Sequence, residues 1–274
     1  MENKMPISVG TKLVKLSQTE FAEVAYRVMA EVFSVHHEMG RLFDEKVYRN
    51  ALVARLDNVK SEVRIDVSFR DFRKPYFMDV IASSGAVFEL KAVSALHAQH
   101  RSQLMNYLLL TELQHGKLVN LRPKKVEHEF VNATQPRAER IKFRIDDSRW
   151  QATDGYGAVE KLLVKELLSD WGTGLERALY EEALIHFTGG SEQVLREIDV
   201  VLDQATLAKQ TVALCAPRIA VRLTTFENDT NGYRKDLIRF INRTELDAIQ
   251  WINISRNQLT FETLGKETLP RVSI

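Results

Sequence analysis

The segment YFMDVIASSGAVFELKAV, residues 76–93, decides the fold of the first half of the chain. Its apolar residues alternate on both sides of a Ser-Ser-Gly turn, which predicts two strands joined as a hairpin. Asp79 lies on the first strand, and Glu89 and Lys91 lie two residues apart on the second. The pleat of a strand therefore places Glu89 and Lys91 on one face, where the hairpin brings Asp79 beside them.

Two carboxylates and an ammonium group in an apolar sheet need a physical reason, because burying unpaired charge is costly. Oxygen ligands of this kind suit Mg²⁺ or Mn²⁺, and a lysine beside them can hold a water that attacks a phosphate. The alternative is a structural ion pair at the edge of the sheet. Spacing alone leaves both interpretations open.

Composition restricts the class of protein. Of 274 residues, 45% are hydrophobic and 27% are charged, which predicts a folded chain rather than a disordered one. The net charge of +1 excludes a polycation that binds nucleic acid indiscriminately. The sequence has no apolar run of membrane-spanning length and no apolar signal core at its start, so we expect a cytoplasmic protein without a membrane partner. Cys215 is the only cysteine, which excludes an intramolecular disulfide and predicts a buried, inert thiol.

The two halves of the sequence repeat each other. Matches keep the same order at an offset of 132 or 133 residues: Tyr48 with Tyr180, Asp66 with Asp199, Glu112 with Glu245, and Asn120 with Asn253. This order predicts a tandem duplication. The polar, glycine-rich stretch at residues 132–157 contains the boundary, and we expect domains at residues 1–140 and 141–274.

The first copy reads as helices, then a strand meander, then a helix and further strands. Ser17 and Glu20 form a capping-box pattern that predicts a helix start, and a later helix is expected from about Ala98 to Leu113. The fold class is therefore mixed α/β, with two domains that each have a central mixed sheet flanked by helices.

A family resemblance rests on three motifs. Asp79, nine further residues and then Glu89-Leu90-Lys91 resemble the D-x(n)-ExK signature of the PD-(D/E)XK nuclease superfamily. Gln103 and Tyr107, spaced QxxxY, resemble the additional motif of its RecB-type branch. HHEMGRLFDEKVYRNAL at residues 36–52 resembles the signature of the GxxExxY family in that superfamily. Leu42 and Met78 depart from the pattern, which usually has a glycine and a proline at these places.

The resemblance implies two restriction-endonuclease-like domains and a set of roles. Asp79, Glu89 and Glu45 would be ligands of Mg²⁺ or Mn²⁺, and Lys91 would position the attacking water. Gln103 and Tyr107 would orient Lys91 or a backbone phosphate. The implied function is divalent-metal-dependent hydrolysis of phosphodiester bonds, with DNA as the partner. The alternative is a non-catalytic module that binds nucleic acid or protein on the same fold.

Basic residues near these motifs are candidates for contact with the nucleic acid backbone. They are Arg73 and Lys74, which precede the first strand's acid, and Arg122, Lys124 and Lys125 in the run RPKK. A solvated loop is the alternative for RPKK. Four histidines, His36, His37, His97 and His100, have no partner ligands at zinc spacing, so we do not expect a zinc site.

The second copy lacks the motif. At an offset of 133, Asp79, Glu89 and Lys91 become Val212, Arg222 and Thr224, and at 132 Glu45 becomes Arg177. We therefore expect catalysis in the first half and a degenerate second half that packs against it as an internal pseudo-dimer. A monomeric chain is one state that this arrangement allows.

Overall fold

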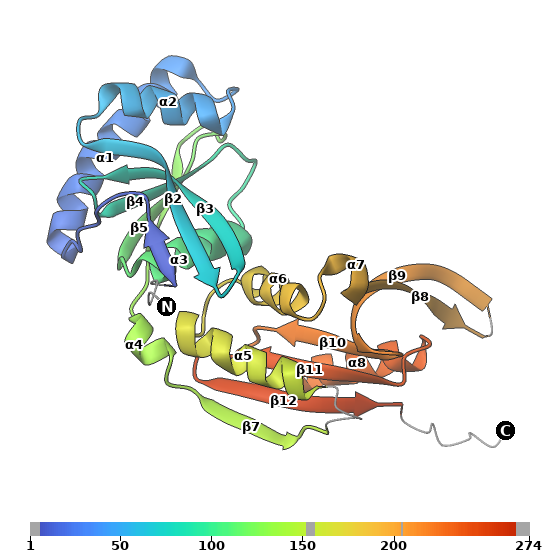
Figure 1. The fold of residues 1–274 in the computed structure, drawn as a ribbon. Coiled ribbons are helices and arrows are strands. Elements are labelled where there is room, and N and C mark those ends of the chain that lie inside the picture. The colour runs from blue at the N-terminus through green and yellow to red at the C-terminus, as the bar shows by residue number, and fades with distance from the viewer. Residues whose placement is uncertain (1–5, 152–156, 204, 267–274) are drawn as a thin grey trace. The chain divides into compact units, whose positions relative to one another are not determined.

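The computed structural model describes residues 6–151, 157–203 and 205–266. The chain divides into two compact units, Met1–Glu139 and Arg140–Ile274. The fold is α/β, as predicted, with two six-stranded mixed sheets flanked by helices (Figure 1). Among the described residues, no helix is long and apolar enough to cross a membrane.

The first unit contains one sheet and three long helices. Its elements are β1 (Ile7–Val9), α1 (Gln18–Met39), α2 (Glu45–Arg55), β2 (Val59–Phe69), β3 (Phe72–Ala82), β4 (Ala86–Lys91), α3 (Ala98–Thr111), β5 (His115–Asn120) and β6 (Glu127–Asn132), followed by the short α4 (Arg137–Arg140) at the boundary between the units. The strand order is β1-β2-β3-β4-β5-β6. Strands β4 and β5 are parallel, and the other neighbours are antiparallel.

The predicted hairpin joins β3 and β4. Ser83 and Ser84 both have positive φ, 48° and 57°, as a tight turn requires. A Cβ on Gly85 would lie 2.2 Å from the carbonyl oxygen of Val14, so only glycine fits beside this passing chain. The turn fixes the pairing of Ile81 with Val87 and thereby sets which charges of β3 and β4 share a face.

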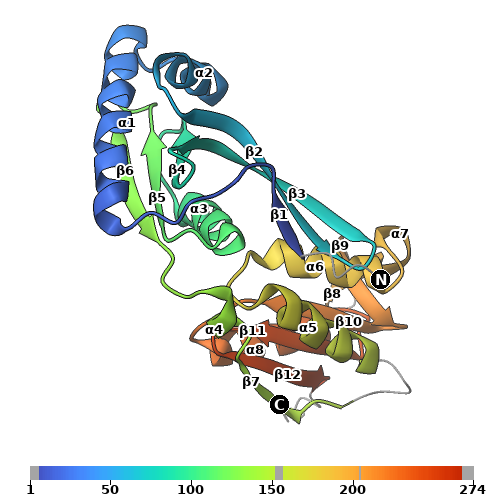
Figure 2. The ribbon, with the colours of Figure 1, turned by 60° about the vertical axis from the view of Figure 1, so that its left-hand side comes forward.

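Helices α1 and α2 cover one face of this sheet (Figure 2). Their core side chains, among them Phe21, Val32 and Leu52, pack with Phe88 and Leu90 of β4. The capping box predicted at the start of α1 is present, since Ser17 and Glu20 exchange side-chain and backbone hydrogen bonds.

Helix α3 covers the opposite face. Leu104 of α3 lies directly over Gly116 of β5, where a Cβ would come within 2.9 Å of Leu104 Cδ1. Residues 87, 89 and 91 of β4 alternate with the core residues Phe88 and Leu90 that face α1 and α2. Glu89 and Lys91 therefore lie on the α3 face of the sheet.

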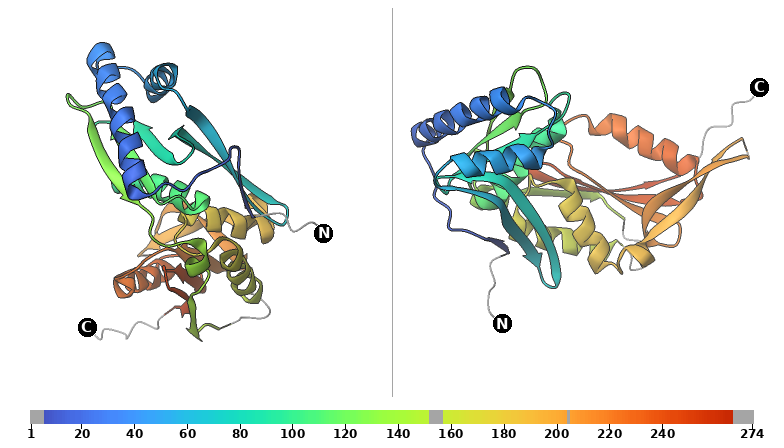
Figure 3. Two further views of the ribbon diagram at one scale, coloured as in Figure 1. Left: turned by 90° about the vertical axis from the view of Figure 1, so that its left-hand side faces the viewer. Right: turned by 90° about the horizontal axis from the view of Figure 1, so that it is seen from above.

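The second unit contains β7 (Arg144–Arg149), α5 (Ala158–Trp171), α6 (Arg177–Phe187), α7 (Ser191–Val194), β8 (Leu195–Leu202), β9 (Ala205–Ala216), β10 (Ile219–Thr224), α8 (Thr230–Asn242), β11 (Ala248–Ile254) and β12 (Gln258–Gly265). The strand order is β7-β12-β11-β10-β9-β8. Strands β8 to β12 repeat the directions of β2 to β6, including the parallel central pair β10 and β11. Helices α5 and α6 lie on one face of the sheet and α8 on the other (Figure 3).

The extra edge strand distinguishes the two sheets. In the first unit β1 pairs antiparallel with β2, whereas in the second unit β7 pairs parallel with β12 at the opposite edge. The sequence left open whether RIKFRI at residues 140–145 is a strand, and the observed strand begins four residues later, at Arg144.

Two local contacts recur in both units. The hydroxyl group of Tyr48 donates to the carbonyl of Gly40 (2.8 Å) and accepts from the amide of Phe43 (3.2 Å). The equivalent bonds occur 132 residues later, where Tyr180 donates to Gly172 (2.6 Å) and accepts from Leu175 (3.2 Å).

An asparagine at the end of the central parallel strand provides the second recurring contact. The side chain of Asn120 accepts from the amide of Val93 (3.1 Å) and donates to its carbonyl (2.9 Å). Asn253 makes the same two bonds with Phe226, at 2.9 and 3.0 Å, with an offset of 133 for both residues.

Candidate active site

Three charged side chains meet inside the first unit at the ends of β3 and β4. Asp79, Glu89 and Lys91 are 7%, 1% and 8% exposed. They sit among fully buried apolar residues of the same strands, so each charge requires a partner.

Glu89 and Lys91 form an ion pair. The Nζ atom of Lys91 donates to Glu89 Oε1 at 2.6 Å and lies 3.7 Å from Oε2 of Glu45. Glu45 is the first residue of α2, so the end of that helix reaches the strand motif. The other oxygen of Glu89, Oε2, is buried and has no hydrogen-bond partner among the described residues.

Asp79 is held by two donors. The amide of Leu90 donates to Asp79 Oδ2 (2.9 Å), and Arg49 Nη1 donates to Asp79 Oδ1 (3.1 Å). Arg49 also lies 2.7 Å from Glu62 Oε1. Sequence reasoning missed Arg49, although its place four residues after Glu45 puts both on one side of a helix.

Burial and repulsion between acids shift the pKa values of this cluster. Burial, followed by the charge of Asp79, raises the pKa of Glu89 to about 8. The same two causes, in the same order, raise the pKa of Glu45. Burial acts to lower the pKa of Lys91, but the charge and hydrogen bond of Glu89 outweigh it and the pKa is raised. Lys91 therefore stays cationic, and Glu89 is the group whose ionised form is disfavoured.

The acids match a hard divalent cation in ligand type. Burial leaves Glu89 Oε2 without a donor while Asp79 repels its charge, and a cation would relieve both costs. In the part of the chain that the structure describes, no group of three or more His, Cys, Asp or Glu side chains is close enough to hold a metal ion. Asp79 and Glu89 are thus the available pair, and Glu45 is turned to Lys91.

The QxxxY residues lie on α3 and contact each other. Gln103 Nε2 donates to the hydroxyl group of Tyr107 at 2.9 Å. The ring of Tyr107 packs edge-on against Tyr76 of β3, with 6.2 Å between the centroids. The hydrogen bond of the Gln103 side chain goes to Tyr107 and not to Lys91 in this structure.

The predicted basic residues differ in their surroundings. Arg73 Nη1 donates to the carbonyls of Arg70 and Phe72, at 2.5 and 2.6 Å. Lys74 Nζ lies 5.3 Å from the ring centroid of Tyr76. Lys124 and Lys125 are exposed.

Arg122 is committed to the backbone. Its guanidinium group donates to three carbonyl oxygens, those of Ala92 (3.1 Å), Arg41 (3.0 Å) and Phe43 (3.3 Å). These bonds fasten the loop in front of α2 to the chain that follows Lys91. Arg122 therefore supports the position of Glu45.

The segment from α1 to β6 has a recognisable family pattern. Residues 22–132 match the model of the PD-(D/E)XK nuclease superfamily. The match contains Glu45, Asp79, Glu89 and Lys91, which supports a nuclease-like fold for the first unit.

The other comparisons are remote. A solved chain titled "Crystal structure of SSO0001" matches with 20% identity and a TM-score of 0.30, covering 44% of this chain. The chain spans 62% of the length of that solved chain. No curated protein matches it.

The PD-(D/E)XK positions of the first unit have different chemistry in the second. Arg222 Nε donates to the hydroxyl group of Tyr233 (2.8 Å), and Thr224 donates to Asn253 (2.8 Å). Arg177 pairs with Glu181, which reverses the signs of Glu45 and Arg49 one copy earlier. These positions hold no acid and lysine set of the PD-(D/E)XK kind.

Proposed function

We propose that the first unit is a divalent-metal-dependent nuclease that hydrolyses phosphodiester bonds of DNA. The observation that carries this proposal is the buried Glu89–Lys91 pair beside Asp79, with one carboxylate oxygen lacking a donor among the described residues. The cluster lies in the segment that matches a nuclease superfamily.

Each residue has a role that its position supports. Asp79 and Glu89 would hold Mg²⁺ or Mn²⁺, and Glu45 would approach as a further ligand. A bound cation would supply positive charge against the negative charge that develops on the phosphate. Lys91 Nζ, kept protonated by the neighbouring carboxylates, would hold the attacking water or a phosphate oxygen. Gln103 and Tyr107 would bind the same phosphate from α3, as the GxxExxY and RecB-type resemblance implies.

The decisive experiment is a nuclease assay with Mg²⁺ and Mn²⁺ on single-stranded, double-stranded and branched DNA, and on RNA. Lys91→Ala should lower turnover by about a hundredfold or more, as expected for a group that acts on the reacting atoms. Arg222→Ala, at the position equivalent to Glu89 in the second unit, should retain activity. Circular dichroism and thermal melting establish that each variant is folded.

A conservative variant guards against a folding defect. Glu89→Gln keeps the shape of the side chain and removes the charge needed by the cation, so it should lose activity while staying folded. Full activity in both Lys91→Ala and Glu89→Gln would refute the proposed site.

One observation favours the second candidate, a non-catalytic module that binds nucleic acid or protein. Arg49 contacts Asp79, and Lys91 lies between Glu89 and Glu45, so the charges are largely paired within the protein. Such a network requires no metal. A Mn²⁺ titration without detectable binding, together with DNA binding but no cleavage, would favour this module.

We also propose that the two units arose by tandem duplication. The repeated contacts of Tyr48 and Tyr180, and of Asn120 and Asn253, support this at fixed offsets. The domain roles follow from it, with residues 1–140 active and residues 141–274 degenerate. The internal pseudo-dimer and the cytoplasmic location stay predictions.

A further inference from the structure

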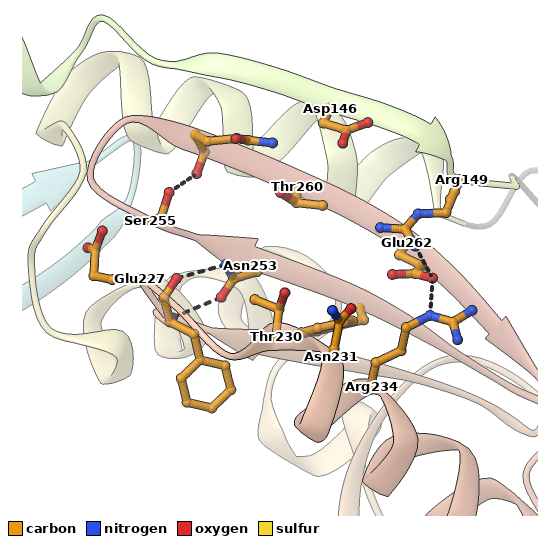
Figure 4. Close-up of a pocket in the computed structure, with 13 residues that line it drawn as sticks. Asp146, Arg149, Glu227, Thr230, Asn231, Arg234, Asn253, Ser255, Thr260 and Glu262 are labelled. Atoms are coloured by element: carbon orange, nitrogen blue, oxygen red, sulfur yellow. Dashed lines mark hydrogen bonds and ion pairs between the residues drawn. The ribbon is translucent and has the colours of Figure 1, made fainter.

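The second unit contains a polar pocket of about 230 Å³ that the sequence did not reveal. It lies on the α8 face of the sheet and is lined from β7, β11, β12, the start of α8 and the segment before it (Figure 4). Arginines, hydroxyl and amide side chains and two aromatic rings line it.

Two arginines converge at one end of this pocket. Glu262 Oε1 accepts from Arg234 Nε (2.6 Å) and lies 3.3 Å from Arg149 Nη1. The Glu262 side chain is 2% exposed, whereas those of Arg149 and Arg234 are 57% and 35% exposed. One carboxylate thus faces two guanidinium groups, which leaves an excess positive charge. A guanidinium has five N–H donors, so most donors of both remain for a ligand.

The equivalent pair in the first unit explains the origin of this arrangement. Arg101 and Glu129, each 133 residues earlier, also form an ion pair, with side chains that are 50% and 33% exposed. In that unit β6 is the last strand of the sheet. In the second unit β7 adds to β12 and supplies Arg149, so the pair becomes a buried site with a second cation.

The other acids of the pocket are already bound by the protein. Asp146 Oδ1 accepts from the amide (3.2 Å) and hydroxyl group (2.8 Å) of Ser148. Glu227 Oε1 accepts from the amide of Arg256 (3.1 Å), and Figure 4 places Glu227 at the end opposite the arginines. The charges are therefore separated, with the cations at one end and hydrogen-bond acceptors toward the other.

An aromatic surface completes the pocket. The Phe226 ring is 38% exposed and packs against Tyr233, with 4.8 Å between the centroids. Tyr233 in turn packs against Trp251, whose indole N–H donates to Thr224 (2.9 Å). Asn253 fixes the backbone of Phe226 on both sides, so the ring is held before any ligand arrives.

We propose that this pocket binds a nucleotide. Its phosphate contacts Arg149 and Arg234, because guanidinium groups recognise phosphate by paired N–H donors. Its base packs on Phe226, because aromatic rings stack on any base without sequence preference. Glu227 and the amide side chains near it accept hydrogen bonds from amino or hydroxyl groups of the ligand. This site does not depend on catalysis in the first unit.

Binding to the full chain tests the proposal by calorimetry in the presence of EDTA, which removes any contribution from the proposed metal site. The probes are adenosine 5′-monophosphate, inorganic phosphate and a short deoxyadenosine oligonucleotide. Arg149→Gln should weaken binding of the monophosphate about tenfold or more, the effect of losing one charge-assisted contact. Arg218→Gln is the matched control, because Arg218 is an arginine of the same unit, 54% exposed and paired with one acid, Asp247, outside the pocket.

The outcomes separate the possible ligands. Tighter binding of the monophosphate than of inorganic phosphate, lost in Arg149→Gln and in Phe226→Ala but kept in Arg218→Gln, supports a free nucleotide. The same pattern with the oligonucleotide alone supports a nucleotide within a single strand. Equal binding of inorganic phosphate and monophosphate, equal loss in Arg149→Gln and Arg218→Gln, or no binding of any probe overturns the proposal. The nuclease assay is independent of all three.

Discussion

Glu89 and Lys91 share a hydrogen bond of 2.6 Å inside the first unit, and the second oxygen of Glu89 has no donor among the described residues. The two side chains leave the same strand two residues apart, so the pleat alone brings them together. The arrangement keeps the lysine charged and makes ionisation of the glutamate costly, and the cost is the reason that a cation would bind here.

Metal affinity should depend on pH through Glu89. Because burial and Asp79 raise its pKa to about 8, the metal-free protein holds a proton there below that pH, and a cation must displace the proton. Mn²⁺ affinity should therefore rise from about pH 6 to about pH 8 and then level off. Calorimetric titration across this range measures it. Glu89→Gln should bind weakly at every pH, and an affinity of the wild type that does not vary with pH would contradict the assignment.

The loop before α2 should depend on Arg122. Arg122→Ala removes donors from three backbone carbonyls, and the loss should lower the free energy of unfolding of the first unit by about 1–3 kcal/mol. Urea denaturation measures the change. Lys125→Ala, three residues away on an exposed side chain, should leave stability unchanged. Similar stability of the two variants would mean that the three bonds do not hold the loop.

The strand motif could be predicted because its information is local. Alternation around a Ser-Ser-Gly turn places Asp79, Glu89 and Lys91 without any knowledge of the rest of the chain. The helix start at Ser17 follows from the same kind of short-range rule and is confirmed. Tyrosine and asparagine matches between the halves also anticipated positions that make the same hydrogen bonds.

Contacts between distant elements could not be predicted in this way. Arg49 reaches Asp79 across 30 residues, and this depends on how α2 packs beside β3. Arg122 is part of a basic run that resembles a phosphate-binding loop, yet its guanidinium group bonds to backbone carbonyls. The pocket at Glu262 depends on β7 joining the far edge of the sheet, which no local pattern specifies.

The single thiol should react slowly in the folded protein. Burial raises the pKa of Cys215 to about 12, and its Sγ donates to the carbonyl of Ile219. Because the thiolate is the reactive form, a disulfide exchange reagent at about pH 8 should react about a hundredfold or more slowly than with the denatured chain. Absorbance during reaction with and without guanidinium chloride measures both rates. Equal rates would show that the thiol is open to reagent in the folded state.

The repeated tyrosines give a test of the two-unit architecture. Tyr48 and Tyr180 are fully buried, and each hydroxyl group bridges a glycine carbonyl and an amide in front of a helix. Phenylalanine keeps the ring and leaves both backbone groups without the hydroxyl partner, so each substitution should lower the free energy of unfolding by about 1–3 kcal/mol. Tyr26→Phe, at a ring that is 80% exposed, is the control and should have no effect.

The two losses should also fall on different units. Hydrogen exchange should show Tyr48→Phe loosening amides of the first unit and Tyr180→Phe loosening amides of the second, because each bridge lies within one unit. Urea denaturation gives the size of each loss. A substitution in one copy that costs as much as its counterpart supports a shared local structure. If only one of the two bridges stabilises its unit, the other is a contact without an energetic role, and the equivalence of the two helix entries fails.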